Sequence, residues 1–265
     1  MTRTASLLSL IVLILVAVAA AGDLFVPGLL RDNAWTVNAI RGQDLYTLVV
    51  ALPAMAIALI PFRRGSLRAA LVVAGILGYL FYTYVGAAMA FAFNEFLLLY
   101  IALYTLSAAA LVAVINTLDL KALPQRFTPV TPRRAVAVYL LVIGFMLCLM
   151  ELAQIIPFIT TGKPPLILEL AGGPTFYPYA LDLGMVVPLS VLAAVWLWRG
   201  HGWGYLLSGC MLIKAATMGM ALLVTNLYAW LVGGTPDPAE LLAVYGLIGF
   251  GGLFMSVWFL RHVRA

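Results

Sequence analysis

Long apolar runs separated by short polar stretches make up the pattern of this chain. The runs lie near residues 5–22, 45–62, 68–91, 96–117, 135–157, 180–198, 203–225 and 240–260. Each is close to the roughly 20 apolar residues that a helix needs to cross a bilayer. None alternates apolar and polar positions with the period of two that marks the strands of a membrane barrel. The pattern predicts an all-α membrane protein with eight transmembrane helices and no soluble domain.

The composition agrees with a lipid environment. Hydrophobic residues make up 65% of the chain and charged residues 9%, whereas soluble domains carry about 25% charged residues. So few polar side chains cannot cover a water-facing surface. The lipid bilayer is therefore the first partner that the sequence implies.

Basic residues gather at the ends of alternate spans. They are Arg3 before the first span, Arg63, Arg64 and Arg68 after the second, Lys121, Arg126, Arg133 and Arg134 after the fourth, Arg199 after the sixth, and Arg261 and Arg264 after the eighth. The other loops hold most of the acids, namely Asp23, Asp32, Asp44, Glu95, Glu169, Asp237 and Glu240. Because cytoplasmic loops are enriched in Lys and Arg, both chain ends are expected in the cytoplasm. The net charge of +5 then reflects topology and not nucleic-acid binding.

The first span has a second interpretation. Arg3, the apolar stretch from Leu7 and the run Ala19-Ala20-Ala21 also suit a signal peptide with a small-residue cleavage site. Cleavage would leave seven spans and an external amino terminus. The apolar run is long for a signal peptide, which favours a retained helix.

The two halves of the chain, residues 1–120 and 121–265, share features in the same order. Asp44, Pro53, Arg64 and Gly65 in the first half parallel Asp182, Pro188, Arg199 and Gly200 in the second, and Glu95–Tyr100 resembles Glu240–Tyr245. We interpret them as two repeats of four helices. Four is an even number, so the copies have parallel orientation about an axis along the membrane normal, with a cavity expected between them. The alternative is that residue types common in membrane helices produce the matches.

Lys214 is the most informative residue because it lies inside an apolar run. It is expected roughly 16 Å from the cytoplasmic end of the seventh span, near the bilayer midplane. A lysine there costs at least about 2.5 kcal/mol and marks a functional site by default. Its stem does not easily reach an interface from that depth. A structural ion pair is the alternative to a functional role.

Five further residues are candidates for the same site. Glu151 and Asp182 are the acids expected to pair with Lys214, and the sequence does not choose between them. Tyr82, Tyr84 and Thr217 are expected to line a polar cavity at similar depth. The alternatives are that Tyr side chains sit at the membrane interface and that Thr bonds its own helix backbone.

No residue pattern assigns catalytic, metal or cofactor groups. Cys148 and Cys210 lie in apolar runs, and His201 and His262 are far apart in sequence. No nucleotide-binding motif is present. Small residues, among them Gly246, Gly249, Gly251 and Gly252, allow close helix contacts within the chain, in a homodimer or with a membrane partner subunit.

Two stretches of the first half resemble a set of bacterial multi-pass membrane proteins. They are Val26–Asn33 with Gly42–Leu45, and Gly78–Leu80 with Phe93–Asn94 and Leu97–Tyr100. The resemblance implies the bacterial inner membrane and brings no activity.

Four functions remain open. The first, which we favour, is a protein that binds or transports a small anionic or amphiphilic molecule at an outward-facing cavity between its halves. The second is an intramembrane lipid-modifying enzyme that uses Glu151, Asp182 and Lys214 as acids and bases; it lacks an Asp-rich or Ser-His motif. The third is a retinal-type receptor with a Schiff base on Lys214. The fourth is a non-catalytic subunit of a membrane complex.

Overall fold

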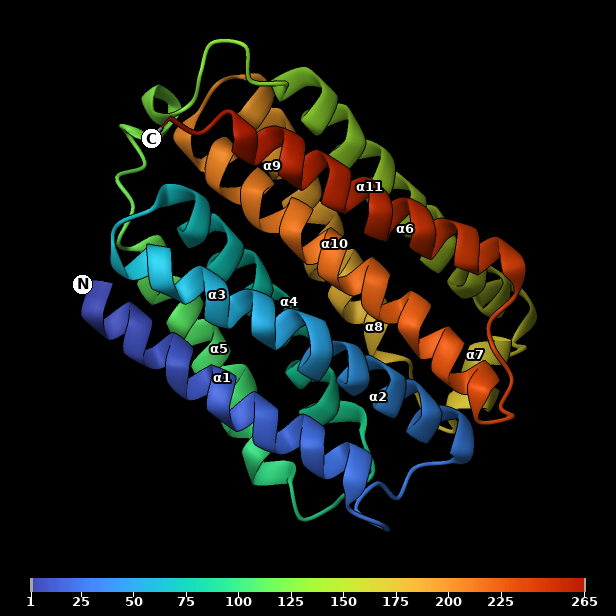
Figure 1. Cartoon of the computed structure of the whole chain (residues 1–265). Helices are drawn as coiled ribbons and strands as arrows, with labels where there is room; N and C mark the ends of the chain where they lie inside the picture. The colour runs from blue at the N-terminus through green and yellow to red at the C-terminus, as the bar shows by residue number, and fades with distance from the viewer. Residues whose placement is uncertain (1, 265) are drawn as a thin grey trace.

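The computed structural model describes residues 2–264. Within these residues the secondary structure consists of helices, and no β-strand is present. Eight helical stretches are long and apolar enough to cross a membrane, which confirms the predicted all-α architecture and its eight long apolar helices. The helices are α1 (Thr2–Phe25), α2 (Ala34–Tyr46), α3 (Leu52–Arg63), α4 (Leu67–Ala90), α5 (Leu97–Ile115), α6 (Arg133–Thr161), α7 (Leu166–Ala171), α8 (Tyr177–Leu181), α9 (Val187–Trp198), α10 (Gly202–Leu231) and α11 (Ala239–Arg261). Figure 1 shows them along the chain.

Two of the spans are each formed by two α-helices joined through a π-helical turn. Thr47–Ala51 joins α2 to α3, and Asp182–Val186 joins α8 to α9. A proline follows each turn, Pro53 and Pro188. Proline has no N–H and its ring clashes with the carbonyl four residues earlier, so a local change of hydrogen bonding at this place lets the helix continue.

Helices α4 and α10 form the centre of the bundle. They pack against each other, and α4 also packs against α3 and α5, while α10 packs against α2, α9 and α11. Of the eight spans, α4 has the largest buried share. Gly75 lies where α4 meets α10, directly against Ile213. A close approach of two backbones through small residues is how helices associate in lipid, where no hydrophobic force drives them together.

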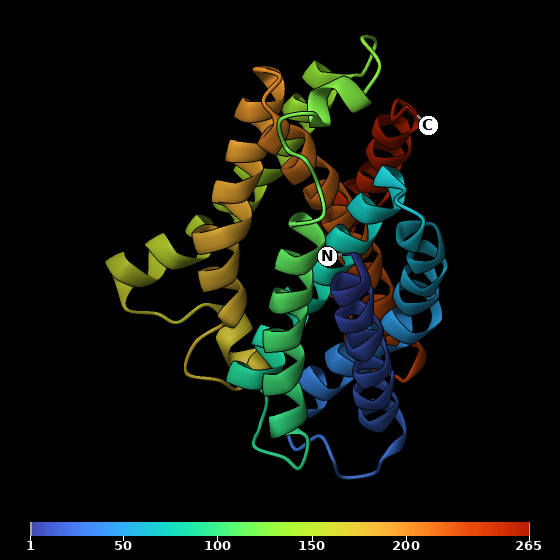
Figure 2. The same cartoon turned by 90° about the vertical axis from the view of Figure 1, so that its left-hand side faces the viewer.

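The outside of the bundle is apolar along the spans. Large exposed hydrophobic side chains include Ile57, Met89, Leu98, Phe254 and Trp230. Figure 2 shows the C-terminal end of α6 turned away from α9, and Ile156, Phe158 and Ile159 are exposed on it. Such a surface is expected where lipid is the solvent.

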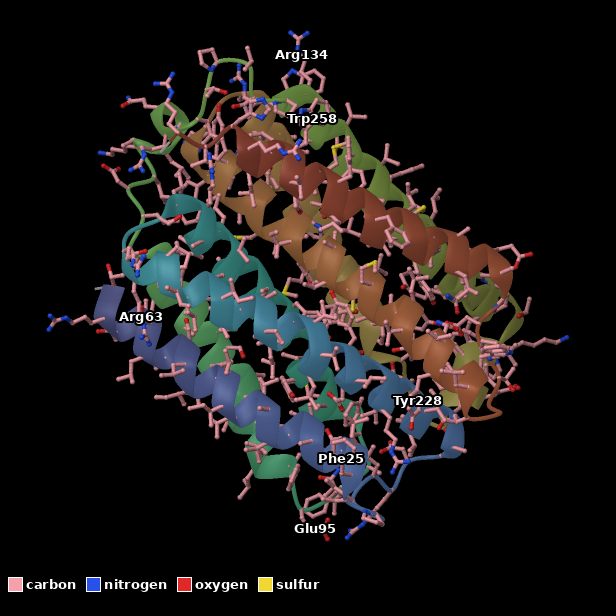
Figure 3. The ribbon with its side chains drawn as sticks, in the orientation of Figure 1. Phe25, Arg63, Glu95, Arg134, Tyr228 and Trp258 are labelled. Atoms are coloured by element: carbon pink, nitrogen blue, oxygen red, sulfur yellow. The ribbon has the colours of Figure 1, made fainter. Side chains whose placement is uncertain are left out.

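Both termini lie at the same end of the bundle, which we call the terminal end (Figure 1). Arg63 and Arg134 lie toward that end, whereas Phe25 and Glu95 lie at the opposite one, which we call the loop end (Figure 3).

The second span begins earlier in the chain than the sequence predicts. It was expected from residue 45, but its helix starts at Ala34, with Asn33 as the N-cap. Asp44 therefore lies inside a helix and is 4% exposed, and Asp23 lies in the last turn of α1 and is 1% exposed. Their assignment to an outer loop is wrong. Arg41 and Gln43 of α2 donate to Asp23 of α1 and Thr83 of α4, so these polar residues lower the hydropathy of α2 while they bond to neighbouring helices.

Candidate functional site

A cavity of about 590 Å³ lies between α4 and α2 on one side and α6, α10 and α11 on the other. We call it the central cavity. It reaches from the middle of the bundle toward the loop end, where the segment around α7 contributes to its wall. Its lining is mainly apolar, with Leu140, Ile143, Met211 and Ile248 among its residues. A few polar groups in an apolar wall are typical of small-molecule sites.

Lys214 lies near the middle of the 30-residue helix α10 and lines the central cavity. Its side chain is 8% exposed, and its Nζ lies 4.1 Å from the centre of the Tyr82 ring. Within residues 2–264, no carboxylate oxygen comes within 4.0 Å of this amine. Lys214 thus forms neither of the expected ion pairs, with Glu151 or with Asp182. A desolvated cation–π contact contributes roughly 2 kcal/mol and partly replaces them.

Glu151 and Asp182 line the same cavity from α6 and from the second π-helical turn. Both are buried, and Oε2 of Glu151 accepts no hydrogen bond from the described residues. Asp182 acts electrostatically on Lys214 and on Glu151. One cation and two acids therefore share this part of the cavity with unused hydrogen-bonding capacity.

The two candidate tyrosines lie on α4 and face different neighbours. Tyr82 lies beneath the Lys214 amine and beside Tyr177, with 6.2 Å between ring centres. Tyr84 stacks on Tyr100, also with 6.2 Å between ring centres. Both line the cavity. Two tyrosines that are close in sequence on α4 thus belong to two separate groups of side chains, one with Lys214 and one with Tyr100.

Thr217 does not line the central cavity. Its hydroxyl donates to the carbonyls of Ile213, at 2.9 Å, and of Lys214, at 3.0 Å, on its own helix. The structure therefore brings together Lys214, Glu151, Asp182, Tyr82 and Tyr84, and leaves Thr217 bonded to its backbone.

The comparisons with known proteins add no assignment. No protein family, curated protein or solved structure matches this chain. Across the described part of the chain, no three His, Cys, Asp or Glu side chains are grouped so that they could hold a metal ion. The geometry of the central cavity is therefore the basis of the functional assignment.

A second polar group in the cavity was missed by the sequence analysis. Asp23 and Asp44 both line it, and their carboxyl groups interact directly. The Tyr100 hydroxyl donates to Oδ1 of Asp23 at 2.5 Å. The signal that could have found this group is Asn33, a typical N-cap residue, which would have started the helix early enough to include Asp44.

A third polar group, to which Asp237 and Tyr245 belong, lies in the wall of the cavity. Asn226 Nδ2 donates to Oδ2 of Asp237 at 3.2 Å, and the Asp237 backbone N–H donates back to Asn226 Oδ1 at 2.6 Å. The Tyr245 hydroxyl donates to Oδ2 of Asp237 at 3.1 Å. The segment before α11 is thereby held down over α10.

The segment around α7 is attached to the start of α2. Asn33 Nδ2 donates to the Leu170 carbonyl at 2.8 Å, and Thr36 Oγ1 donates to the Ala171 carbonyl at 3.3 Å. Leu170 and Ala171 line the central cavity. Two side-chain hydrogen bonds thus hold one wall of the cavity near its loop end.

Replacing Asn33 by aspartate is expected to free the α7 segment without harming α2. Asn33 Oδ1 also accepts from the Thr36 N–H at 2.9 Å as the N-cap, and an aspartate keeps that bond but cannot donate to Leu170. Hydrogen–deuterium exchange in Leu166–Ala171 should rise about tenfold, the equivalent of one hydrogen bond of roughly 1.4 kcal/mol. Asn33→Ala, which loses both bonds, should also raise exchange in the first turn of α2. Unchanged exchange in α7 for both variants contradicts the attachment.

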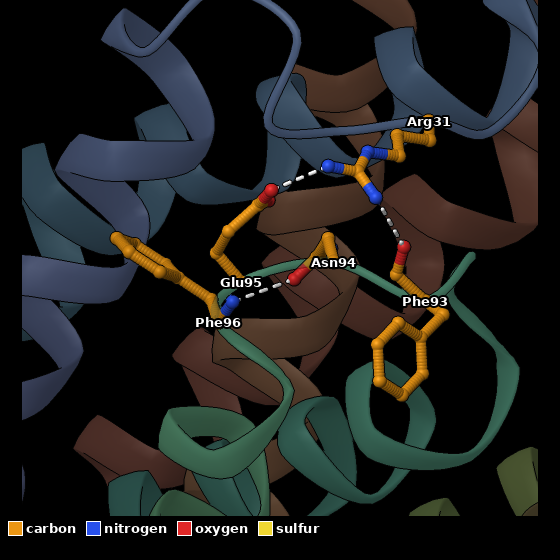
Figure 4. Close-up of polar contacts among 5 residues, drawn as sticks. All are labelled: Arg31, Phe93, Asn94, Glu95 and Phe96. Atoms are coloured by element: carbon orange, nitrogen blue, oxygen red, sulfur yellow. Dashed lines mark hydrogen bonds and ion pairs between the residues drawn. The ribbon is translucent and has the colours of Figure 1, made fainter.

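An ion pair ties the α1–α2 loop to the α4–α5 loop (Figure 4). Arg31 binds the Glu95 carboxylate and donates to the Phe93 carbonyl at 3.3 Å. The Asn94 side chain accepts from the Phe96 N–H at 2.9 Å and shapes the same turn. The pair lies at the loop end of the bundle.

Replacing Arg31 by alanine is expected to have little effect. The Arg31 and Glu95 side chains are 51% and 62% exposed, and exposed ion pairs contribute about 0–1 kcal/mol. The midpoint of thermal unfolding in detergent should fall by no more than roughly 4 °C, the shift that about 1 kcal/mol produces in a chain of this size. A larger fall at both low and high salt would show that the pair is structurally essential.

Proposed function

We propose that the protein binds a small molecule in the central cavity and carries it across the membrane. The observation that supports this is Lys214, which lines the cavity near the middle of α10 and has no carboxylate of the described residues 2–264 in ion-pairing range of its amine. A charge at that depth costs at least about 2.5 kcal/mol. An anionic group of a ligand that enters the cavity would offset this cost.

The rest of the cavity indicates the body of the ligand. Apolar side chains dominate the wall, including Leu140, Ile143 and Ile248. A ligand that satisfies both features is amphiphilic, with an anionic group at Lys214 and an apolar part against this wall. Glu151 and Asp182 lie close to the expected anionic group, so hydroxyl or amine donors next to it would also be recognised.

The experiment is a thermal-unfolding screen of the purified protein in detergent. The panel contains amphiphilic carboxylates, phosphate esters and sulfonates, each with an uncharged analogue. A specific ligand at about 100 times its Kd stabilises the protein by about 2.7 kcal/mol. Compounds that stabilise it are then tested for uptake into proteoliposomes. Equal stabilisation by charged and uncharged analogues would contradict the proposal.

We also propose that residues 1–120 and 121–265 are two four-helix repeats related by an axis along the membrane normal. Three features that support this proposal have the same spacing in both halves. They are a π-helical turn, the proline two residues after it, and a glycine at positive φ that ends the span. These glycines are Gly65 (φ 84°) and Gly200 (φ 74°). The helices that follow them, α4 and α10, are the two central ones.

We propose further that both termini face the cytoplasm of a bacterial cell, with the protein in the inner membrane. The support is the gathering of Arg and Lys side chains at the terminal end, including Arg63 and Arg134 (Figure 3). The central cavity would then face outward. A homodimer or a membrane partner subunit remains compatible with the exposed apolar faces.

Cysteine labelling is expected to report this orientation. In a background where Cys148 and Cys210 are replaced by alanine, the Lys163→Cys variant should react with a membrane-impermeant maleimide in intact cells. The Arg134→Cys variant should react only after permeabilisation, because its exposed position lies at the other end of the bundle. The reverse pattern would place both termini outside.

A further inference from the structure

We propose that Asp23 and Asp44 together hold one exchangeable proton in the central cavity. The proton is bound to Asp44, whose carboxyl group donates it in a hydrogen bond to the Asp23 carboxylate. This site is distinct from the group around Lys214. The proton held at this site would couple transport of the ligand to the proton gradient. That coupling rests on the proposed transport function, whereas the proton site itself does not.

The first step is the burial of the two acids. Asp23 is 1% and Asp44 4% exposed, and they come from different helices, α1 and α2. Their carboxyl groups are direct neighbours. Two carboxylates that share a desolvated site cannot both be ionised, so one of them takes up a proton.

The second step is the count of charges around the pair. The titratable and charged groups that act on the pair are Arg41 of α2, Tyr79 and Tyr84 of α4, and Tyr100 of α5. Arg41 is the single cation among them, and its Nε donates to the backbone carbonyl of Asp23 at 3.2 Å. Two carboxylates, one guanidinium and one proton give a neutral group. Neutrality is what a membrane interior favours.

The third step assigns the proton to one of the two acids. Asp23 Oδ1 already accepts a hydrogen bond from the Tyr100 hydroxyl at 2.5 Å, and Arg41 lies beside it. Asp44 has no such donor, and its Oδ2 is buried without a partner among the described residues. A buried oxygen without a partner is costly as a carboxylate and is satisfied when it carries a proton that it donates. Asp44 is therefore the acid and Asp23 the base of the pair.

The fourth step is access. Asp23 and Asp44 both line the central cavity, which also contains Lys214. A proton on Asp44 can thus exchange with water that enters the cavity. Loss of the proton would leave a net negative charge in the same cavity that binds the ligand, so the two occupancies affect each other.

Infrared spectroscopy of the full-length protein in lipid tests the site without any ligand. Protein with aspartate labelled by ¹³C at the side-chain carboxyl should show, at pH 7, the carbonyl band of a protonated aspartic acid. The band should shift after transfer to D₂O. The Asp44→Asn variant should lose it, and the matched Asp32→Asn variant, a change in a cavity-lining acid outside the pair, should keep it.

The outcomes separate the alternatives. Absence of a protonated aspartate band in the labelled wild-type protein overturns the proposal, even if Asp44→Asn does not fold. A band that survives Asp44→Asn and is lost in Asp182→Asn places the proton elsewhere and also overturns it. Loss of the band on addition of Na⁺ at constant pH identifies a sodium site instead. A band that stays unshifted in D₂O shows a sealed pair, not an exchangeable one. None of these results depends on whether a ligand is transported.

Discussion

Replacing Lys214 by methionine is expected to remove the stabilisation that an anionic ligand gives, while the ligand-free protein becomes more stable. In the part of the chain that the structure describes, no carboxylate lies in ion-pairing range of the amine, so methionine removes a buried charge and leaves no broken salt bridge. An ammonium–anion hydrogen bond contributes about 1.5–3 kcal/mol. Its loss weakens binding roughly 10- to 150-fold.

The measurement is ligand titration by thermal unfolding and by uptake in proteoliposomes. Lys163→Met, which removes a lysine from the exposed loop after α6, is the matched control and should bind as the wild type does. Lys214→Arg should retain part of the affinity, because it keeps the charge with a different shape. A Lys214→Met protein that is less stable and binds normally would show that the lysine is structural.

Replacing Gly249 by valine is expected to prevent the stable association of α10 and α11. A Cβ at Gly249 would meet the backbone of Gly219 and Met220, at 2.9 and 2.8 Å. Neither contact is with the flexible end of a side chain, so the two helices must move apart. Overpacking of this kind costs about 1–3 kcal/mol or more, and here it disturbs one wall of the central cavity.

Gly246→Val provides the control on the same helix. Among the described residues, no atom of a neighbouring helix lies within 4 Å of a Cβ built at Gly246, and the valine has the same helix propensity there. Size-exclusion chromatography in detergent should show a folded monodisperse species for Gly246→Val and loss of that species for Gly249→Val. Equal behaviour of the two variants would mean that the α10–α11 contact does not depend on small residues.

The spans were predictable because hydropathy reports directly which segments prefer lipid. The start of α2 was not predictable, because it contains polar residues that face the protein interior, including Arg41, Gln43 and Asp44. A hydropathy average along the chain assigns such residues to a loop. Hydropathy measures composition, whereas burial depends on which face of a helix meets its neighbours. The missed Asp23–Asp44 pair follows from this error and from a first span that was predicted to end one residue before Asp23.

Within the candidate site, depth was predictable and contacts were not. Counting residues along α10 places Lys214 near the midplane, and the structure puts Glu151, Asp182, Tyr82 and Tyr84 in the same cavity. The sequence could not show that Lys214 lies over the Tyr82 ring and has no closed ion pair, because this depends on the rotation of three helices. The hydroxyl of Thr217 shows the same limit, since it bonds to its own helix.

Each of the two π-helical turns places one extra residue in its span. One added residue rotates the positions on one side of it by about 100° relative to those on the other. Asp182 begins the second turn, and Asp44 precedes the first by less than one helical turn. The extra residue therefore sets the direction in which each of these carboxyl groups faces relative to the rest of its span.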